Sequence, residues 1–449
     1  MRLTLSDLAV ATGGTVTGDA TTAVDGLGID SRALPPGAGF VALVAERDGH
    51  DFVPAAVAHG AAAVIAERQL SGAEDPGVPV LVVEDTAVAL LAIGRLARDR
   101  LPDRVVGVTG SVGKTSTKDL LAAVLGARWT TAASARSFNN EIGVPLTLVG
   151  APPDTGAAVI EMGARGPGHI ALLCGIARPT AAVVTAVADA HLEMFGTIDD
   201  VARAKGELVE ALPPEGVAVL NADDARVAAM AERTTAQVLT YGVGPASEAD
   251  VRATDVELDD LLRPRLLLRS PWGDAPVGLQ VHGAHQAANA VAAAACALAL
   301  GVDLDDVVEA LGTASISGMR MQVERASSGL VVVNDAYNAN PTSTRAALDA
   351  LAALPVTGRK VAALGLMAEL GPDGDELHRQ VAVYAEERGI DVVSVAAPAY
   401  GVADAVLDAR AAADHLAALG PGDAVLVKGS RVAGLEAVAE ALLRDRSGE

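Results

Sequence analysis

One segment of the sequence constrains the fold more than any other. An apolar stretch from Val105 to Thr109 runs into Gly110-Ser111-Val112-Gly113-Lys114-Thr115, and a helix-forming stretch follows from Ser116 to Leu125. This order predicts a short strand, a tight turn of small residues and then a helix. Because the helix carries the chain back along the sheet, such a unit is typical of a parallel sheet with helices on its faces.

The alternation of strands and helices continues along the chain. Further strands of the first series are expected at Ala158 to Glu161, Ala181 to Val184 and Val217 to Leu220. Residues 245–281 favour short antiparallel strands instead. After Ile316-Ser317-Gly318 the alternation begins again, with strands expected near Val331, Val361, Val392 and Val425. The second series predicts a smaller, doubly wound domain.

The length and one proline-containing segment predict the domain organisation. A chain of 449 residues is too long for one hydrophobic core. Arg100-Leu101-Pro102-Asp103-Arg104 is typical of a linker, because proline disfavours a helical conformation in the residue before it. We therefore expect three domains, at residues 1–100, 101–316 and 317–449. The predicted class is α/β, with a central parallel sheet between a small N-terminal α/β domain and a Rossmann-like C-terminal domain.

The glycine-containing turn is suited to a triphosphate. Its small residues let backbone N–H groups converge on phosphate oxygens, and the helix N-terminus adds positive potential. Lys114 would reach the β- and γ-phosphates of ATP, and the Thr115 hydroxyl would bind Mg²⁺. The spacing departs from G-x-x-x-x-G-K-[ST], because Val108 stands at the first glycine position. The alternative is a tight turn without a ligand, but the predicted strand and helix are the context that the motif requires. We therefore expect a mononucleotide-binding P-loop in the central domain.

Three further side chains are candidates for the metal and the reaction. Glu161 ends one apolar strand and His191 follows the next, so both are expected at the sheet edge where ligands bind. Glu161 could instead cap a helix, and a lone histidine is more often structural than a ligand. Lys205 lies just beyond, and by itself it would be interpreted as a solvated helix lysine.

Composition argues against several classes of protein. The formal net charge of −23 is unfavourable for a nucleic-acid partner, which would require a basic face. The longest apolar run, Val291 to Leu300, is far shorter than the ~20 residues of a membrane span and predicts a packed helix. Cys174 and Cys296 form no C-x-x-C or metal spacing, and the first residues lack the apolar region of a signal peptide. We expect a cytoplasmic protein with no membrane partner.

Together the motifs resemble the Mur ligase family, the ATP-dependent amide ligases that build the peptidoglycan stem peptide. The resemblance spans the whole chain. Besides the glycine turn it is carried by Ser137-Phe138-Asn139-Asn140-Glu141-Ile142-Gly143-Val144-Pro145, Glu161-Met162-Gly163, Ala190-His191-Leu192, Lys205, His282-Gly283-Ala284-His285, Asn289, Met319-Arg320 and the run from Asp335 to Pro341. Each motif alone is a weak signal, whereas the combination is specific.

The resemblance implies roles at the metal site. Glu161 and His191 would hold magnesium beside Thr115. Lys205 would be carbamylated by CO₂ and would help to position a second Mg²⁺. This chemistry is available to an amine kept neutral by its surroundings but not to a guanidinium.

The resemblance also implies contacts to the nucleotide. Asn139 or Asn140, together with Asn289, would face the adenine, and Asp335 would contact its ribose. Arg320 would reach the γ-phosphate from the third domain. Lys114, Lys205, His191 and Arg320 would then be the catalytic residues, and Gly110, Ser111, Val112 and Gly113 would cradle the phosphates with Lys114 and Thr115.

Within the family, the run Asp335-Ala336-Tyr337-Asn338-Ala339-Asn340-Pro341 resembles the member that adds D-alanyl-D-alanine to UDP-N-acetylmuramoyl-tripeptide through an acyl phosphate. The first domain would bind the UDP part through Ser31 and Arg32. The third domain would bind the amine, with Asn338 and Asn340 as candidates, and close over ATP. The alternatives are the member that adds the third amino acid and a nucleotide-binding homologue without ligase activity. The sequence leaves open whether the tripeptide carries diaminopimelate or lysine, and a monomer is expected.

Three positions depart from the family pattern. Thr185-Ala186 occupies a stretch where asparagine is frequent, Gln286 follows the second histidine of the His282 motif where asparagine is common, and Leu366 stands where an acid is usual. These changes bear on peripheral contacts more than on the nucleotide site.

Overall fold

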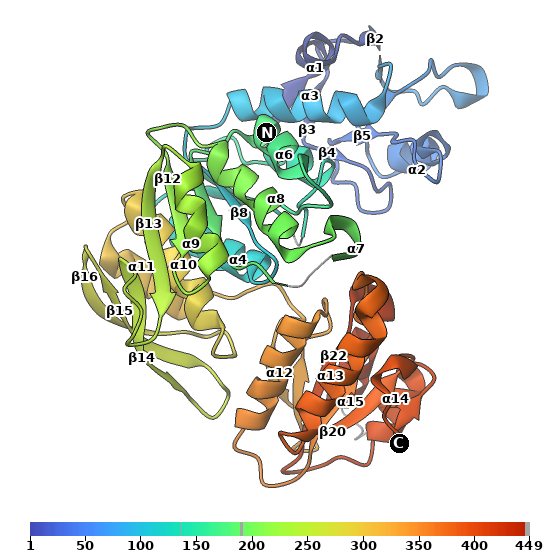
Figure 1. Ribbon diagram of the computed structural model, residues 1–449. Coiled ribbons are helices and arrows are strands. Elements are labelled where there is room, and N and C mark those ends of the chain that lie inside the picture. Colours follow the sequence, from blue (N-terminus) through green and yellow to red (C-terminus); the bar gives the residue numbers. More distant parts are fainter. Residues whose placement is uncertain (136, 189–191, 445–449) are drawn as a thin grey trace.

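The computed structural model describes residues 1–135, 137–188 and 192–444 of the chain. Three α/β units follow one another along it: an N-terminal unit in blue, a central unit in cyan to yellow, and a C-terminal unit in orange to red (Figure 1). The predicted α/β class with three domains is confirmed. Within the described ranges, no helix combines the length and the apolarity that crossing a membrane requires.

The N-terminal unit contains a five-stranded sheet and a separate antiparallel pair. Its strands are β1 (Arg2–Thr4), β2 (Thr15–Thr17), β3 (Ala23–Asp25), β4 (Leu27–Gly28), β5 (Gly39–Val41), β6 (Ala63–Ala66) and β7 (Val80–Val82). Its helices are α1 (Leu5–Thr12), α2 (Val53–Ala58) and α3 (Thr86–Asp99), with short 3₁₀ turns at Gly49–Phe52 and Gly72–Glu74. The sheet order is β2-β7-β6-β5-β4, with β2 antiparallel to β7 and the others parallel, while β1 pairs with β3.

The central unit is a nine-stranded sheet in the order β16-β15-β14-β13-β12-β11-β8-β10-β9. Its strands are β8 (Val105–Thr109), β9 (Thr131–Ala133), β10 (Ala157–Glu161), β11 (Ala181–Val184), β12 (Val217–Asn221), β13 (Gln237–Val243), β14 (Val251–Leu258), β15 (Pro264–Ser270) and β16 (Gly273–Gly278). Its helices are α4 (Lys114–Gly126), α5 (Gly143–Val149), α6 (His169–Ala177), α7 (Leu192–Phe195), α8 (Ile198–Glu210), α9 (Ala225–Ala228), α10 (Gln286–Ala299) and α11 (Leu304–Thr313), with a 3₁₀ turn at Ala229–Arg233. The predicted antiparallel strands are β14, β15 and β16, and they extend the parallel sheet rather than forming a separate one.

Helices cover both faces of this sheet because successive strand residues point to opposite sides. In β10, Ala158 and Ile160 pack with α3, α5, α6 and α8, whereas Ala157 and Val159 pack with α4, α10 and α11. Strands buried on both faces must be apolar throughout, which is the pattern of β8 and β10. The apolar run near Val291 forms the buried helix α10, as predicted.

The C-terminal unit is a six-stranded, doubly wound sheet in the order β17-β18-β22-β19-β20-β21. Its strands are β17 (Gln322–Arg325), β18 (Val331–Asn334), β19 (Lys360–Leu364), β20 (Asp391–Val395), β21 (Ala405–Val406) and β22 (Ala424–Lys428). Its helices are α12 (Pro341–Ala353), α13 (Gly374–Glu386), α14 (Ala409–Leu416) and α15 (Glu436–Leu443), with 3₁₀ turns at Gly371–Asp373, Pro398–Tyr400 and Arg431–Ala433. Only β17 is antiparallel to its neighbour in this sheet. Helices α12 and α13 pack on one face, and α14 and α15 on the other.

The N-terminal and central units share one hydrophobic core. Leu90 and Ile93 of α3 belong to the same buried cluster as Val144 of α5 and Ile170 of α6. Gly94 allows this close approach, because a Cβ there would lie 2.9 Å from Pro145 Cβ. The predicted linker at residues 100–104 is therefore the short connection between two units that are packed together.

A hairpin of the central unit reaches the C-terminal unit. The end of β14 and the loop that follows it carry Leu258, Leu261 and Leu262, which pack in the same cluster as Met321 and Val323. The Leu262 side chain is fully buried there, and the Leu262 carbonyl accepts a hydrogen bond from Gly283 N–H at 2.8 Å. This apolar contact supports the segment through which the chain enters its last unit.

Candidate functional site

A cavity of about 740 Å³ lies between the central and C-terminal units. The central unit contributes the turn after β8, which we call the glycine loop (Gly110–Thr115), at the N-terminus of α4. The predicted residues that line the cavity are Ser111, Val112, Gly113, Lys114, Thr115, Asn139, Glu161 and Asn289 from the central unit and Arg320, Asp335, Asn338 and Asn340 from the C-terminal unit. Motifs that are more than two hundred residues apart in the sequence therefore meet in one space.

The two glycines of the glycine loop are required by its backbone and its neighbours. Gly110 has a φ of +150° and Gly113 a φ of +82°, both in the region that side chains disfavour. A Cβ on Gly110 would lie 1.9 Å from Thr185 Oγ1, and one on Gly113 would lie 2.6 Å from Asn289 Oδ1. Larger residues at either position would therefore displace the loop.

The segment that directly follows β11 holds the glycine loop in place. Ser111 N–H donates to the Ala186 carbonyl at 2.7 Å, and Thr185 Oγ1 donates to the Val112 carbonyl at 2.6 Å. Ser111 Oγ also donates to the Ala188 carbonyl at 3.1 Å and accepts from Ala188 N–H at 3.0 Å. Thr185, which departs from the family pattern, thus fixes the backbone of the glycine loop.

Lys114 is folded back onto its own loop. Its Nζ donates to the Gly110 carbonyl at 2.7 Å and lies 3.4 Å from the Ser111 carbonyl. Burial lowers the pKa of Lys114, while the nearby Glu161 carboxylate raises it. A phosphate bound in the loop would offer the ammonium group a charged partner in place of two carbonyls.

Oxygen ligands for a hard cation converge beside the glycine loop. Thr115 Oγ1 donates to Glu161 Oε2 at 2.8 Å, and Asn139 Nδ2 donates to Glu161 Oε1 at 2.9 Å. A hydroxyl and a carboxylate in contact fit the oxygen preference of Mg²⁺, which usually takes few protein ligands and completes its shell with water and phosphate. Among the described residues no group of three His, Cys, Asp or Glu side chains could hold a metal ion, and the predicted ligand His191 lies outside those residues.

Lys205 is a buried amine on α8. It is 4% exposed, and its ammonium group makes no hydrogen bond or ion pair to the part of the chain that the structure describes. Burial lowers the pKa of Lys205 well below its usual value, and the positive charge of Lys114 lowers it further. The interpretation of Lys205 by itself as a solvated helix lysine is therefore wrong, because this side chain is buried in the protein.

Arg320 reaches the central unit from the beginning of the C-terminal unit. Its Nη2 donates to Thr115 Oγ1 at 2.9 Å, and its guanidinium lies 4.0 Å from the centre of the Tyr337 ring. Its buried Nε has no hydrogen-bond partner among the described residues. A buried donor without a partner is costly, so an anionic ligand in the cavity would relieve it.

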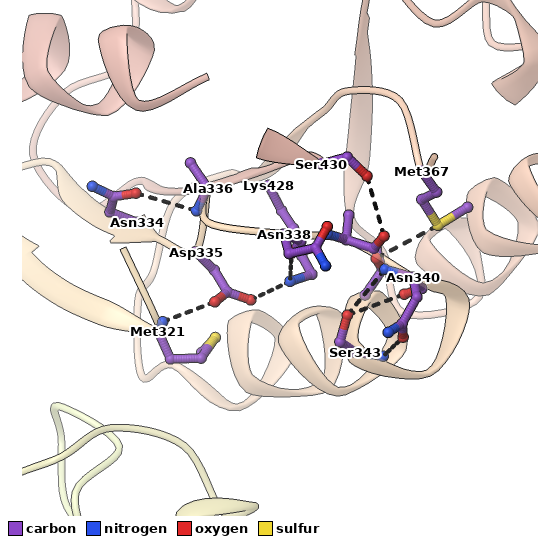
Figure 2. A network of polar contacts seen from close by, with 12 residues as sticks. Met321, Asn334, Asp335, Ala336, Asn338, Asn340, Ser343, Met367, Lys428 and Ser430 are labelled. Carbon is purple, nitrogen blue, oxygen red and sulfur yellow. Dashed lines mark hydrogen bonds and ion pairs between the residues drawn. The ribbon is translucent and has the colours of Figure 1, made fainter. Parts of the chain in front are cut away.

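A second polar network holds the Asp335–Pro341 run (Figure 2). Asp335 Oδ1 accepts from Met321 N–H at 3.0 Å, and Asp335 Oδ2 lies 2.5 Å from Lys428 Nζ. Lys428 also donates to the Asn338 carbonyl at 2.9 Å. Lys428, at the end of β22, therefore holds the start and the middle of the run that faces the cavity.

Two of the candidate asparagines serve the backbone. Asn140 Oδ1 accepts from Ile142 and Gly143 N–H groups at the start of α5, and Asn140 is not among the residues that line the cavity. Asn340 is the N-cap of α12 and accepts from Ser343 N–H at 2.8 Å, with Pro341 at the first helical position (Figure 2). Of the pair considered for the adenine, Asn139 lines the cavity.

Asn289 and Asn338 face the cavity with part of their amides engaged. Asn289 Oδ1 accepts from Thr117 Oγ1 at 3.2 Å, and Asn289 Nδ2 donates to Gln286 Oε1 at 2.8 Å. Gln286, the second departure from the family pattern, therefore orients Asn289. Asn338 Oδ1 accepts from Ala339 N–H at 2.9 Å.

The predicted substrate residues of the N-terminal unit lie away from this cavity. Ser31 is buried, whereas Arg32 is exposed and paired with Asp30 through Nε at 2.9 Å and Nη2 at 2.8 Å. The pairing lowers the pKa of Asp30 to about 2. An exposed arginine held by one carboxylate is available to a phosphate ligand, but nothing else in its surroundings marks a binding site.

Tyr337 is a cavity residue to which motif reasoning assigned no role. Its hydroxyl forms a hydrogen bond with Ser137 Oγ across the junction, and its ring lies beneath Arg320. The available signal was its rarity, because Tyr337 is one of only four tyrosines in the sequence. Aromatic residues are enriched where a contact must be both apolar and hydrogen-bonded.

Comparison with known proteins identifies relatives over the whole chain. Three family profiles match: "Mur ligase family, catalytic domain" at residues 23–98, "Mur ligase middle domain" at residues 108–297, and "Mur ligase, glutamate ligase domain" at residues 319–431. A Mycobacterium bovis protein named UDP-N-acetylmuramoyl-tripeptide–D-alanyl-D-alanine ligase is 41% identical over 474 residues, covering 93% of this chain and 91% of that protein.

Solved structures show the same similarity in three dimensions. Crystal structure I of MurF from Acinetobacter baumannii has a TM-score of 0.87 and 32% identity over 99% of both chains. MurF from Thermotoga maritima in complex with ADP has a TM-score of 0.79 and 29% identity, covering 93% of this chain and 97% of that one. The relative with ADP is consistent with a nucleotide in the cavity described above.

Proposed function

This chain belongs to the Mur ligase family of ATP-dependent ligases, and on that premise we propose that it joins D-alanyl-D-alanine to UDP-N-acetylmuramoyl-tripeptide. The observation that carries the proposal is the cavity in which the glycine loop faces Arg320 and the Asp335–Pro341 run. The names of the relatives that match most of the chain support the choice of substrates. The central unit would bind ATP, the N-terminal unit the UDP-sugar, and the C-terminal unit the incoming amine.

The proposed reaction has two steps, phosphoryl transfer and amide formation. A carboxylate oxygen of the tripeptide attacks the γ-phosphorus of ATP, ADP leaves, and an acyl phosphate forms. The free amine of D-alanyl-D-alanine then attacks the acyl carbon, loses a proton, and inorganic phosphate leaves as the amide bond forms. Phosphoryl transfer depends chiefly on positioning and on neutralising charge, so the cations that face the cavity carry most of the catalysis.

The residues of this chain divide that task. The glycine loop would hold the phosphates through backbone N–H groups, and Lys114 would leave its two loop carbonyls to contact the β- and γ-phosphates. Arg320 would bind the transferred phosphoryl group with Nε and Nη2. Thr115 and Glu161 are the described residues that fit Mg²⁺, which when bound would neutralise phosphate charge. The predicted ligand His191 would complete this set.

We propose that Lys205 is carbamylated. Its neutral amine would bond to the carbon of CO₂ and lose one proton, which gives a carbamate anion. The support is a buried amine that has no partner among the described residues and whose pKa is lowered well below its usual value by burial, which favours the neutral form. The carbamate anion would attract the Lys114 ammonium group, whose positive charge disfavours an ammonium group at Lys205.

The carbamate is tested by substitution at position 205. Lys205→Arg keeps a positive charge that CO₂ cannot modify, so we expect normal ATP binding with a loss of about 10²-fold or more in kcat, the size of effect seen when a positioned catalytic group is removed. Lys205→Ala should recover activity in part when a small carboxylate such as acetate is added. Full activity in Lys205→Arg would show that the reaction needs no carbamate.

The activity is tested by measuring ADP and phosphate release with purified protein. We expect release only when ATP, the UDP-tripeptide and D-alanyl-D-alanine are all present, tested with both the diaminopimelate and the lysine tripeptide. Comparable turnover with free diaminopimelate or lysine as the amine, and UDP-dipeptide as the acceptor, would assign the chain to the third-residue reaction instead. ATP binding without any product would indicate a nucleotide-binding homologue that has lost ligation.

A further inference from the structure

The segment that carries Arg320 is fixed to the central unit at its start. Ser317 N–H and Ser317 Oγ–H both donate to Asp119 Oδ2, at 2.8 and 2.7 Å. Asp119 lies on α4, just over one turn after the lysine and threonine of the glycine loop. The segment that leads into the C-terminal unit is therefore anchored to α4, the helix whose N-terminus faces the cavity.

The second carboxylate oxygen of Asp119 is held from inside the central unit. Lys118 Nζ lies 2.6 Å from Asp119 Oδ1 and donates to the Ser134 carbonyl at 2.7 Å. Ser134 Oγ in turn accepts from Glu161 N–H at 3.1 Å. A continuous series of polar contacts thus connects Glu161, the candidate metal ligand, to Ser317, where the segment into the C-terminal unit begins.

The backbone beyond Ser317 has little freedom. Met319 and Met321, on either side of Arg320, have φ values of +60° and +52°, a conformation that side-chain-bearing residues adopt only when their surroundings enforce it. Met321 N–H is held by Asp335 Oδ1 (Figure 2), and Ser317 is held by Asp119. Fixation at both ends places the Arg320 side chain against Thr115.

We propose that Asp119 is a positioning residue that sets how far Arg320 reaches into the cavity. Asp119 is not among the residues that line the cavity and acts through Ser317 and the strained segment that follows. The inference rests on the proposed function, because the contribution of Arg320 is measured as ligase activity. Loss of the Asp119 contact would free the start of the segment, and an error of about 1 Å in a catalytic group can cost about 10²-fold in rate.

Two variants test this role. Asp119→Ala removes both hydrogen bonds to Ser317, and we expect kcat to fall about 10- to 100-fold, with KM values for ATP and the amine within about threefold of wild type. Ser317→Ala removes only the hydroxyl bond and leaves the Lys118–Asp119 pair intact, so its kcat should fall about 3- to 10-fold. The matched control is Asp154→Ala, which removes the acceptor of a comparable hydrogen bond from Thr130 Oγ1 at the surface, and it should have wild-type activity.

A double-mutant cycle with Arg320→Ala decides between positioning and general damage. If Asp119 acts through Arg320, Asp119→Ala should cost less than about twofold in kcat when Arg320 is already absent. The same loss in both backgrounds, or wild-type kcat in folded Asp119→Ala, would overturn the proposal. If Asp119→Ala does not fold, Ser317→Ala is combined with Arg320→Ala in the same double-mutant cycle. Failure of the proposed function would look different, because the wild-type protein would then release no ADP with its substrates.

Discussion

The two junctions between the units of this protein are built in opposite ways. The N-terminal and central units share an apolar core, in which α3 packs on α5 and α6. The central and C-terminal units instead face each other across a cavity of about 740 Å³ and are joined by a few polar contacts and one apolar hairpin tip. Apolar burial holds two units permanently, whereas hydrogen bonds can be exchanged for bonds to a ligand. The first junction is a fixed platform, and the second is the place where ligands and catalytic groups meet.

Two arginines express the same contrast. At the first junction, Arg98 is buried and fully used: its guanidinium donates to the carbonyls of Ala177 at 2.7 Å, Arg178 at 3.2 Å, and Leu101 and Pro102, each at 3.3 Å. At the second junction, Arg320 bonds Thr115 but leaves a buried Nε without a partner in the described chain. A saturated arginine is structural, while an unsaturated one facing a cavity is available to a ligand. Charge and burial alone would not distinguish them.

The largest expected effect comes from removing the unsaturated arginine. Arg320→Ala should lower kcat about 10²- to 10³-fold, because one preorganised charged donor at a transferring group contributes about 2.7–4 kcal/mol. The melting temperature should change little, since the side chain makes one hydrogen bond to the part of the chain that the structure describes. Steady-state ADP release and thermal unfolding measure the two quantities. Activity near wild type would contradict the assignment of Arg320 to catalysis.

The next effect comes from the saturated arginine, and it should fall on stability. Arg98→Ala leaves several buried carbonyls without donors, so we expect the free energy of unfolding to fall by about 2–4 kcal/mol. The kcat of the folded fraction should stay within about twofold of wild type. Chemical denaturation measures the change. Arg95→Ala on the same helix is the control, because Arg95 is exposed and makes one long bond, 3.4 Å to the Gly175 carbonyl. A large loss of kcat without a loss of stability would show that the first junction is not a passive platform.

The smallest effect is expected from the hydroxyl that bridges the second junction. Tyr337→Phe removes the hydrogen bond to Ser137 but keeps the ring beneath Arg320. We expect kcat to fall about 2- to 5-fold, in line with about 0.5–1 kcal/mol for one such bond, with unchanged stability. Tyr337→Ala, which also removes the ring, should be several-fold worse. Equal activity of Tyr337→Phe and wild type would mean that the contact contributes nothing to closure.

Sequence reasoning predicted the features that depend on local order. A strand, a turn of small residues and a helix specify the glycine loop, and parallel strands bring their carboxyl ends to one edge, which predicts Glu161 at the edge where ligands bind. The family resemblance adds that Glu161 lies beside Thr115, and the two side chains are 2.8 Å apart. The buried state of Lys205 is implied by the family resemblance, and the spacing of Val201, Leu208 and Val209 also places this lysine on the apolar side of α8. The roles of these residues in the reaction stay predictions.

Other features depend on contacts that no local pattern records. Arg98 looks like any arginine near a helix end, and its carbonyl partners near residue 177 are about eighty positions away. Asn340 lines the cavity with Asn338, but its side-chain oxygen caps α12, and the Asn140 oxygen accepts backbone N–H groups at the start of α5. An asparagine that can cap or bind is assigned by geometry, not by its motif.

The strand order of the C-terminal sheet has a consequence for the synthesis of the chain. Strand β22, the last to leave the ribosome, lies between β18 and β19, which are made about a hundred and about sixty residues earlier. Neither of those strands can complete its pairing until β22 arrives, and β22 also brings Lys428 to Asp335. During synthesis the N-terminal and central units can therefore fold before the C-terminal unit is able to. Any truncation before residue 424 should leave the C-terminal unit unable to fold.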